Sequence, residues 1–311
     1  MNTIKSYIDH LINDELKSEI KEIYSTGTDE INTLLKGVMP GELCVLFGDI
    51  ASGKTALSIR MLDYQSIDNK VPSLFFCVRN TPESIIHRLI GYRCSIHYRS
   101  FKLREKLEDV ETQLQLNKIA ESPIYLYQSH YVTIDDVCEI CKQHVEEFGV
   151  KIVFLHYLYI GGKDQALRLR LLARELGIVI VLLENQLIFG EGICGFLPFL
   201  KDLSEDYLNE YSDIVIGLCD YERYRITMDT SGRDLRGLIH VEILKARDGE
   251  SGGEYYLRKD YLHLKNYVVP HLIPPSWQPK ERYFDDDSVE GLVSPLVLQP
   301  EAKSANNLNK D

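Results

Sequence analysis

Apolar and polar positions alternate along most of the chain in a pattern that predicts strands and helices in turn. Residues 73–78, 151–155 and 178–183 are almost entirely apolar, as is typical of strands covered on both faces of a parallel sheet. Between such runs, apolar residues recur every three or four positions, which predicts helices. We therefore predict an α/β fold with strands at 42–47, 73–78, 124–127, 151–155, 178–183, 213–218 and 238–244, and helices at 54–64, 82–98, 103–116, 134–148, 164–176 and 200–209.

The two ends of the chain differ from this core. Residues 1–24 carry one apolar stripe and predict an amphipathic helix, and residues 254–258 and 262–266 predict an antiparallel hairpin. Six of the eleven prolines lie between Pro270 and Pro300, beside an acidic cluster at 285–287. We expect a linker helix at 1–25, a single domain at 26–268, and a Pro-rich acidic tail at 269–311 that is largely disordered.

A glycine-rich segment between the first strand and the first long helix fits the pattern G-x4-G-K-[ST]. Its residues are Gly48, Asp49, Ile50, Ala51, Ser52, Gly53, Lys54 and Thr55. In such a loop the backbone N–H groups and the helix N-terminus face phosphate oxygens. Lys54 would reach the β and γ phosphates and Thr55 would ligate Mg²⁺. The loop therefore predicts the binding of ATP or a related nucleoside triphosphate.

Composition limits the setting and the partners. The net charge of −12 disfavours nucleic-acid binding through the overall field, so such a contact needs a local basic patch or a ring of subunits. No stretch reaches 18 apolar residues, and the chain begins without the apolar run of a signal peptide. The seven scattered cysteines suggest reduced thiols, so we expect a cytoplasmic protein. Cys138, Cys141 and His144 share one helical stripe, and core packing is a better interpretation of them than a metal site.

Several segments around the loop occur in the order and spacing of a known family. These segments are STGTDEINTLLKGVMPGELCVLFG, LFFCVRNTPE, IVFLHYLYI, LARELGIVIVLLENQL, EYSDIVIGL and EILKARDGESG. From about residue 26 to residue 267, the chain resembles the C-terminal RecA-like ATPase domain of DnaB-type replicative helicases. The resemblance covers about three quarters of the sequence.

The resemblance implies a RecA-like P-loop fold, with a doubly wound, mostly parallel sheet and antiparallel strands at its C-terminal end. It implies a hexamer-like ring of copies, or an assembly with a related helicase, with ATP and Mg²⁺ between neighbours and single-stranded DNA in the middle. Residues 1–24 match the family's linker helix, with no counterpart of the N-terminal primase-contacting domain before it. Gln186 matches the switch glutamine, and Lys245 and Arg247 match the pair that reaches the neighbour's γ-phosphate.

Two positions depart from the family pattern at residues that take part in ATP hydrolysis in the family. His156 replaces the Walker B aspartate, and a neutral imidazole suits a hard, oxygen-seeking ion poorly. Arg79 aligns with the catalytic glutamate, and because a guanidinium cannot accept a proton, its expected task is to pair with phosphate oxygens. Both residues are therefore predicted in the nucleotide site, with Glu184 or Glu83 as candidates for a relocated water-activating carboxylate.

Three hypotheses for function remain open. The chain is either an ATP-driven DNA translocase with a rearranged site, or a catalytically weak or inactive ring protein that uses ATP as a regulatory or structural switch. The third hypothesis is another RecA-family module, for recombination or of the clock type.

The expected DNA contact is weak for a single copy. The segment at 188–200 contains no Lys or Arg, although the family carries basic residues in loops facing the ring's centre. Arg168, Arg170 and Arg174 are interpreted as a solvated helix face. The better candidates for a strand contact are Arg223, Arg225, Arg233 and Arg236.

Overall fold

The computed structural model of the chain describes residues 4, 22–78, 80–96, 106, 108–156, 158, 162–185, 198–203, 207–229, 232, 234–247, 251–259 and 264–267. All of them belong to one compact unit, Met1–Leu272, of the two into which the chain divides. The tail at 269–311 and most of the helix predicted at 1–24 lie outside the described residues. Residues 22–24 are not helical, and Tyr24 instead forms a bridge to Val38, so the predicted helix ends too late.

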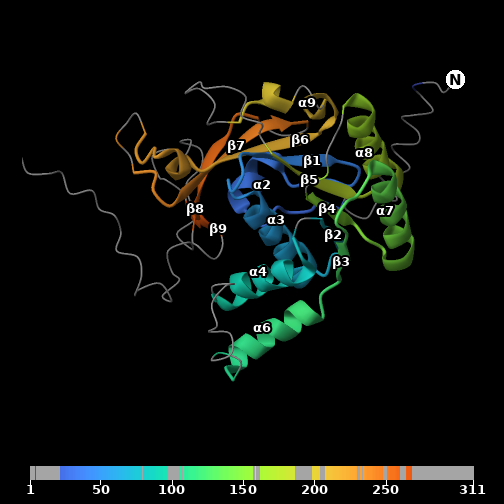
Figure 1. Cartoon of the computed structure of the whole chain (residues 1–311), viewed down its shortest axis with the longest axis horizontal. Helices are drawn as coiled ribbons and strands as arrows, with labels where there is room; N and C mark the ends of the chain where they lie inside the picture. Colours follow the sequence, from blue (N-terminus) through green and yellow to red (C-terminus); the bar gives the residue numbers. More distant parts are fainter. Residues whose placement is uncertain are drawn as a thin grey trace, which may run out of the picture. The chain divides into compact units, whose positions relative to one another are not determined.

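The described strands form one nine-stranded sheet in the order β3-β2-β4-β5-β1-β6-β7-β8-β9 (Figure 1). The first six strands in this order are parallel to one another, and β7, β8 and β9 continue the sheet antiparallel. This arrangement confirms the predicted fold class, including the C-terminal hairpin. The strands are β1 (Leu43–Gly48), β2 (Ser73–Cys77), β3 (Ile124–Gln128), β4 (Ile152–His156), β5 (Val179–Asn185), β6 (Ile214–Cys219), β7 (Leu238–Ala246), β8 (Glu254–Lys259) and β9 (Leu264–Tyr267).

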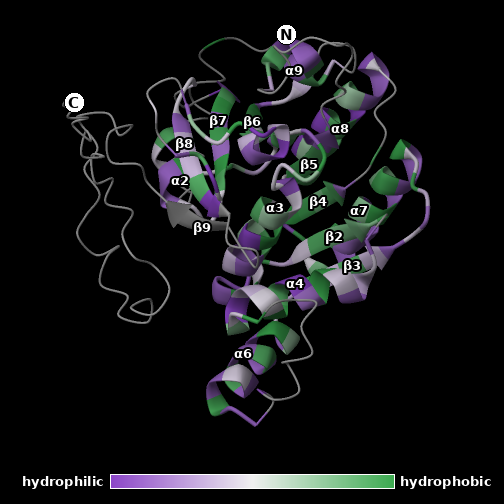
Figure 2. Ribbon diagram, turned by 60° about the vertical axis from the view of Figure 1, so that its left-hand side comes forward, coloured by the Kyte–Doolittle hydropathy of each residue, from purple (hydrophilic) through white to green (hydrophobic). Residues whose placement is uncertain are grey.

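Helices cover both faces of the parallel part of the sheet. On one face, alternate strand residues such as Leu46 and Phe154 pack with α2 (Asp29–Leu35), α3 (Lys54–Leu62) and α4 (Pro82–Cys94). On the other face, residues such as Phe47 and Leu155 pack with α7 (Ile134–Phe148) and α8 (Lys163–Leu176). Burial on both faces explains why these strand sequences are continuously apolar, and Figure 2 shows β2, β4 and β5 mainly in the hydrophobic colour.

Three predicted helices had wrong boundaries, and local backbone geometry explains them. The helix predicted at 82–98 ends at Cys94 because Ser95 is left-handed, with φ of 50°. The helix predicted at 103–116 is interrupted at residues 108–109, and α6 (Val110–Ala120) begins after Asp109, whose side chain caps it by accepting the Thr112 N–H. The helix predicted at 200–209 is replaced by two short elements, because Tyr207 has a φ of 56°. These elements are the 3₁₀ helix η2 (Leu200–Leu203) and α9 (Leu208–Tyr211).

The helical segment predicted at 54–64 extends beyond its predicted end, and its last part is a π-helix rather than an α-helix. After Leu62 the chain continues as the π-helix η1 (Asp63–Asp68). Asp63 is buried there, and its carboxylate accepts two bonds from the Arg93 guanidinium, at 2.7 and 3.1 Å. This ion pair joins the end of the first long helix to α4.

Parallel strands place their carboxyl ends at one edge of the sheet, and the register of this sheet aligns them closely. Gly48 at the end of β1 lies beside Asn185 of β5 on one side and Leu218 of β6 on the other. His156 ends β4 beside Leu183. Because ligands of α/β proteins bind at this edge, it is where the candidate site is expected.

Candidate functional site

The glycine-rich loop at 48–55 connects β1 to α3 at the carboxyl edge of the sheet. A side chain at Gly48 would place its Cβ 2.2 Å from the backbone oxygen of Leu218, so only glycine fits between the two strands. Gly53 caps α3 with φ of 103°, a conformation in which glycine carries no steric cost. The strand, tight loop and helix N-terminus together form a backbone cradle that suits phosphate.

Lys54 lies at the centre of this loop and is 5% exposed. Its ammonium donates to the backbone oxygens of Gly48, at 2.8 Å, and Asp49, at 2.7 Å. Burial lowers the pKa of Lys54 from 10.5 to about 8, and the charges of Asp49 and Glu184 act in the opposite direction. A bound anion would stabilise the charged form of Lys54, and this interaction would favour the binding of phosphate in the loop.

Thr55 faces His156 across the end of β4. The Oγ1 atom of Thr55 is 3.5 Å from Nε2 of His156, and the amide nitrogen of Asn80 is 2.7 Å from Nδ1 on the other side of the ring. With the amide donating to Nδ1, the imidazole carries its proton on Nε2 and presents an N–H to Thr55. The replacement predicted at the Walker B position therefore faces the hydroxyl that was expected to ligate Mg²⁺. Asn80 was not foreseen as a site residue, although its position just beyond β2 indicated this edge.

These donors fit Mg²⁺ only in part. Thr55 offers one hydroxyl oxygen, whereas the ion prefers an octahedron of oxygens often completed by a carboxylate. Within the described part of the chain, no three His, Cys, Asp or Glu side chains gather as a metal site. An ion held at Thr55 would therefore take most of its ligands from the nucleotide and water.

Two carboxylates lie near the loop. Glu184 on β5 pairs in register with Phe47 of β1, and its carboxylate accepts the Asn185 N–H at 3.1 Å. Asp49, inside the loop, accepts the hydroxyl of Tyr224 at 2.6 Å. Glu83, the other candidate for the relocated acid, is an exposed residue in the first turn of α4. Arg79 and Gln186, both predicted at this edge, lie outside the described residues.

Lys245 and Arg247 lie at the opposite, amino edge of the sheet. They lie there because β7 runs antiparallel to β6, so that the end of β7, at Ala246, lies beside Ile214 at the start of β6. Lys245 donates to the backbone oxygens of Asn209, at 2.8 Å, and Ser212, at 2.7 Å. Since β1 has six residues at about 3.3 Å each, this edge is roughly 17–20 Å from the phosphate loop of the same chain.

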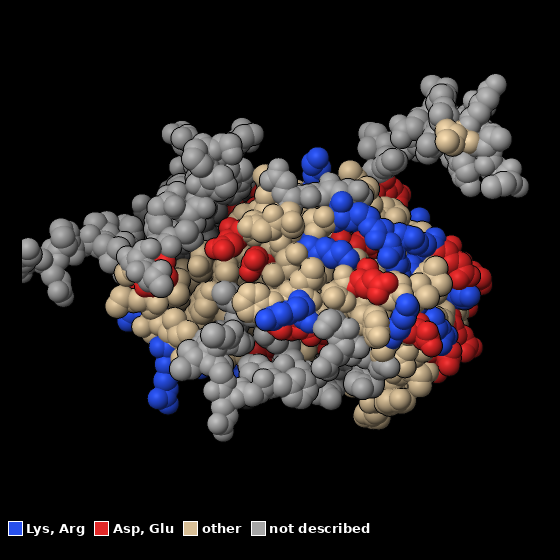
Figure 3. All heavy atoms as spheres, turned by 90° about the horizontal axis from the view of Figure 1, so that it is seen from above, with Lys and Arg blue, Asp and Glu red and all other residues tan. Residues whose placement is uncertain are grey.

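Arg247 forms an ion pair of 2.6 Å with Asp213, which is 2% exposed. Arg170 and Arg174 of α8 approach the same carboxylate at 3.5 and 3.9 Å. Three guanidinium groups thus share one buried carboxylate. Figure 3 shows one face of the molecule, on which several Lys and Arg side chains lie close together with Asp and Glu among them. The predicted solvated face was wrong for Arg170, which is 15% exposed, and correct for Arg168, which pairs with exposed Asp135.

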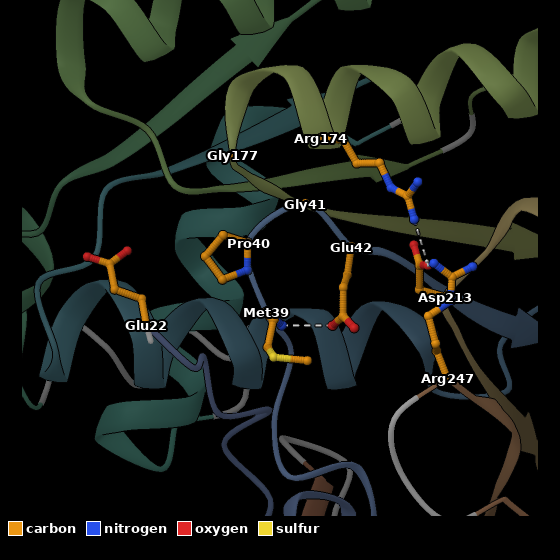
Figure 4. A pocket seen from close by; sticks show the side chains of 9 residues that line it. All are labelled: Glu22, Met39, Pro40, Gly41, Glu42, Arg174, Gly177, Asp213 and Arg247. Carbon is orange, nitrogen blue, oxygen red and sulfur yellow. Dashed lines mark hydrogen bonds and ion pairs between the residues drawn. The ribbon is translucent and has the colours of Figure 1, made fainter. Parts of the chain in front are cut away.

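A pocket of about 490 Å³ opens beside this cluster. Figure 4 shows Arg174 and Arg247 pointing toward Asp213 on one side and Glu42 bonded to the Met39 backbone on another. The pocket lies between the segments that lead into the parallel strands. Its lining residues are Glu22, Met39, Pro40, Gly41, Glu42, Arg174, Gly177, Asp213 and Arg247.

The structure agrees with some of the remaining predictions from the sequence and differs from others. Cys141 is fully buried in the core, as predicted, and His144 stays on its own helix with Nδ1 at 2.8 Å from the Ile140 oxygen. Among the arginines proposed for a DNA strand, Arg236 pairs with Asp234, whereas Arg223 lies 3.7 Å from Asp49 of the phosphate loop. Arg233 and most of the segment at 188–200 lie outside the described residues. Among the described helices, none combines the length and apolarity that crossing a bilayer requires.

Comparisons with known proteins agree with this architecture. Residues 24–259 match the family model of the DnaB-like helicase C terminal domain. The replicative DNA helicase DnaB of Leifsonia xyli subsp. xyli is 24% identical over 207 residues, which cover 61% of this chain and 45% of the helicase. That of Buchnera aphidicola subsp. Baizongia pistaciae is 22% identical over 247 residues, which cover 73% of this chain and 52% of the helicase. The chain therefore spans about half the length of these relatives.

Solved structures show the same fold. The ATPase domain of G40P superposes with a TM-score of 0.71 at 21% identity, over 86% of this chain and 99% of that domain. A DnaB-like replicative helicase, studied with its interactions with primase, gives a TM-score of 0.70 at 19% identity, over 85% and 68% of the two chains. With more than half of its residues matched by the family model, this chain belongs to the DnaB-like helicase C-terminal domain family.

Proposed function

We propose that this chain binds ATP, with Mg²⁺, in the loop at 48–55, and that neighbouring copies in a DnaB-type ring complete each other's nucleotide sites. The observation that carries the proposal is the separation of the two halves of the site. The phosphate loop lies at the carboxyl edge of the sheet, and Lys245 and Arg247 lie at the amino edge. Because one chain cannot bring these groups to a single nucleotide, a second copy, or a related helicase subunit, supplies the other half.

Charge at the amino edge supports this arrangement. Asp213 carries one negative charge against the three guanidinium groups of Arg170, Arg174 and Arg247. Burial lowers the pKa of Arg170, and the neighbouring Arg247 and Arg174 lower it further. A triphosphate presented by a neighbour would relieve this excess of positive charge.

Hydrolysis is proposed to be weak. His156 offers an N–H where a carboxylate would hold the metal's water shell, and Glu184 is the described strand-end carboxylate that could activate a water molecule. Loss of a water-activating group typically removes a factor of about 10² to 10⁴ in rate. This favours an ATP-dependent switch over a fast translocase, and the family match favours a role with single-stranded DNA in replication over a recombination or clock-type function.

ATP turnover with and without single-stranded DNA tests the proposal, with Lys54→Ala as the control. Nucleotide binding with turnover near that of Lys54→Ala supports the switch. Turnover well above that control and stimulated by DNA supports the translocase, and its loss in Glu184→Gln would identify the relocated acid. Absence of nucleotide binding by the wild-type chain at any concentration tested would refute both.

A further inference from the structure

The phosphate loop contains a carboxylate of its own. Asp49 directly follows Gly48, and its side chain is 19% exposed. Its Oδ1 atom accepts the Ile50 N–H at 2.6 Å, and its backbone oxygen accepts a bond from Lys54 at 2.7 Å. A negative charge therefore stands within the cradle whose backbone donors and lysine would serve a triphosphate.

Two residues of η3 (Tyr221–Tyr224) hold this carboxylate. The Tyr224 hydroxyl donates to Oδ2 of Asp49 at 2.6 Å, and Nη1 of Arg223 is 3.7 Å from the same oxygen. Asp49 and Tyr224 are 175 residues apart in sequence. They meet because β1 and β6 are parallel neighbours, so the segments that follow the two strands leave the sheet side by side.

The alternative partner for the carboxylate is Lys54. The negative charge of Asp49 raises the pKa of the Lys54 ammonium, against the lowering by burial, so the two groups interact electrostatically. A carboxylate released from η3 would approach this ammonium and neutralise the charge that a phosphate needs. Held by Tyr224 and Arg223, it stays bonded on the η3 side.

We propose that Tyr224, assisted by Arg223, is a positioning residue of the nucleotide site, which keeps Asp49 from competing with the triphosphate for Lys54. The inference rests on the proposed function, because it assumes that the triphosphate occupies the loop. It assigns to the residues after β6 a role in nucleotide affinity, and it moves Arg223 from the group of DNA candidates to the phosphate loop.

A double-mutant cycle on the full chain tests the proposal, with affinity for a non-hydrolysable ATP analogue measured by calorimetry. Tyr224→Phe is expected to weaken binding about tenfold, the effect of losing one hydrogen bond to a charged group. Asp49→Asn is expected to bind at least as tightly as wild type. In the Asp49→Asn background, Tyr224→Phe is expected to change affinity less than about twofold, because the charge to be held is gone.

Tyr221→Phe is the matched control. Tyr221 begins the same 3₁₀ helix, but its hydroxyl lies 3.1 Å from Nδ1 of His240 rather than at the loop. It should leave affinity unchanged, and thermal unfolding without nucleotide checks that each variant folds. Should Tyr224→Phe misfold, Asp49→Asn alone still decides, since weaker binding by that variant overturns the proposal.

The possible failures are distinguishable. The role of Tyr224 would be overturned if Tyr224→Phe reduced nucleotide affinity equally in the wild-type and Asp49→Asn backgrounds. It would also be overturned if the single variant Tyr224→Phe bound nucleotide more tightly than wild type. Either result would leave the proposed function intact. Wild-type binding no stronger than that of Lys54→Ala would overturn both.

Discussion

The Nε2 atom of His156 lies 3.5 Å from the hydroxyl oxygen of Thr55, and Asn80 holds the other ring nitrogen at 2.7 Å. An imidazole fixed in this way places an N–H beside the residue that would ligate Mg²⁺. It donates a hydrogen bond to that oxygen but cannot orient the ion's water ligands as a carboxylate does. We therefore expect the affinity for ATP to depend little on Mg²⁺.

Changing His156 to Asp should restore coupling between nucleotide and metal. We expect wild-type affinity for ATP to differ little between EDTA and Mg²⁺, and His156→Asp to gain about tenfold in affinity when Mg²⁺ is added, as is typical of groups that orient metal ligands. Calorimetric titrations in both buffers measure this. His87→Asp, at an exposed position of α4, makes the same chemical change away from the loop and should have no effect. A large Mg²⁺ dependence in wild type that His156→Asp leaves unchanged would contradict the interpretation.

Arg247→Ala should leave the nucleotide site of a single copy intact and disrupt the contact between copies. Arg247 pairs with Asp213 at the amino edge, far from the phosphate loop of its own chain. We expect affinity of the isolated chain within about twofold of wild type, because distant sites act independently. ATP-dependent self-association, followed by sedimentation velocity, should be lost.

Arg168→Ala provides the comparison, since Arg168 lies on α8 and pairs with exposed Asp135 away from the pocket. It should assemble as wild type does. If Arg247→Ala assembled normally with ATP, the amino edge would not be the second half of the nucleotide site.

Nucleotide affinity should fall as pH rises above about 8. Lys54 has a pKa of about 8 in the free protein, because it is buried, and a bound triphosphate should raise that pKa. Binding then takes up a proton between the two pKa values, so affinity decreases about tenfold per pH unit there. Calorimetry at pH 9 in buffers of different ionisation enthalpy would detect the proton taken up. Affinity that is constant from pH 7 to pH 9 would exclude Lys54 as the group that responds to phosphate.

The Arg93–Asp63 pair should matter for stability rather than binding. Both side chains are nearly buried, at 9% and 6% exposure, so removing Arg93 leaves a carboxylate without its cation. We expect Arg93→Ala to lower the free energy of unfolding by about 3 kcal/mol, as measured by urea denaturation. Arg236→Ala removes a pair with Asp234 in which the arginine is 65% exposed, and it should change stability little. Similar stability of both variants would contradict a structural role for the buried pair.

The sequence predicted what depends on local pattern. Continuous apolar runs identified the parallel strands, and the spacing of Gly48, Gly53 and Lys54 identified the loop at the end of the first one. The structure brings His156, which the resemblance assigned to the Walker B position, to 3.5 Å from Thr55, and the role of both residues toward a nucleotide stays a prediction. Arg79, Gln186 and the domain boundaries remain predictions.

What the sequence did not predict depends on strand order. Tyr224 meets Asp49, and Arg170 meets Asp213, only because β6 lies next to β1 in the sheet. The local sequence pattern does not show that these two strands are neighbours in the sheet. Arg170 was therefore interpreted as a solvated residue. Single residues with positive φ, such as Ser95 at the end of α4 and Tyr207 just before α9, likewise escaped the periodic pattern.

Calorimetric titration of ATP into the wild-type chain and into Lys54→Ala is the most direct test of the phosphate loop as a triphosphate site. Wild type should bind one nucleotide per chain, and Lys54→Ala, with its fold verified by circular dichroism, should lose most of that affinity. Equal binding by the two proteins, or no heat from either one, would contradict the assignment of residues 48–55 to nucleotide binding.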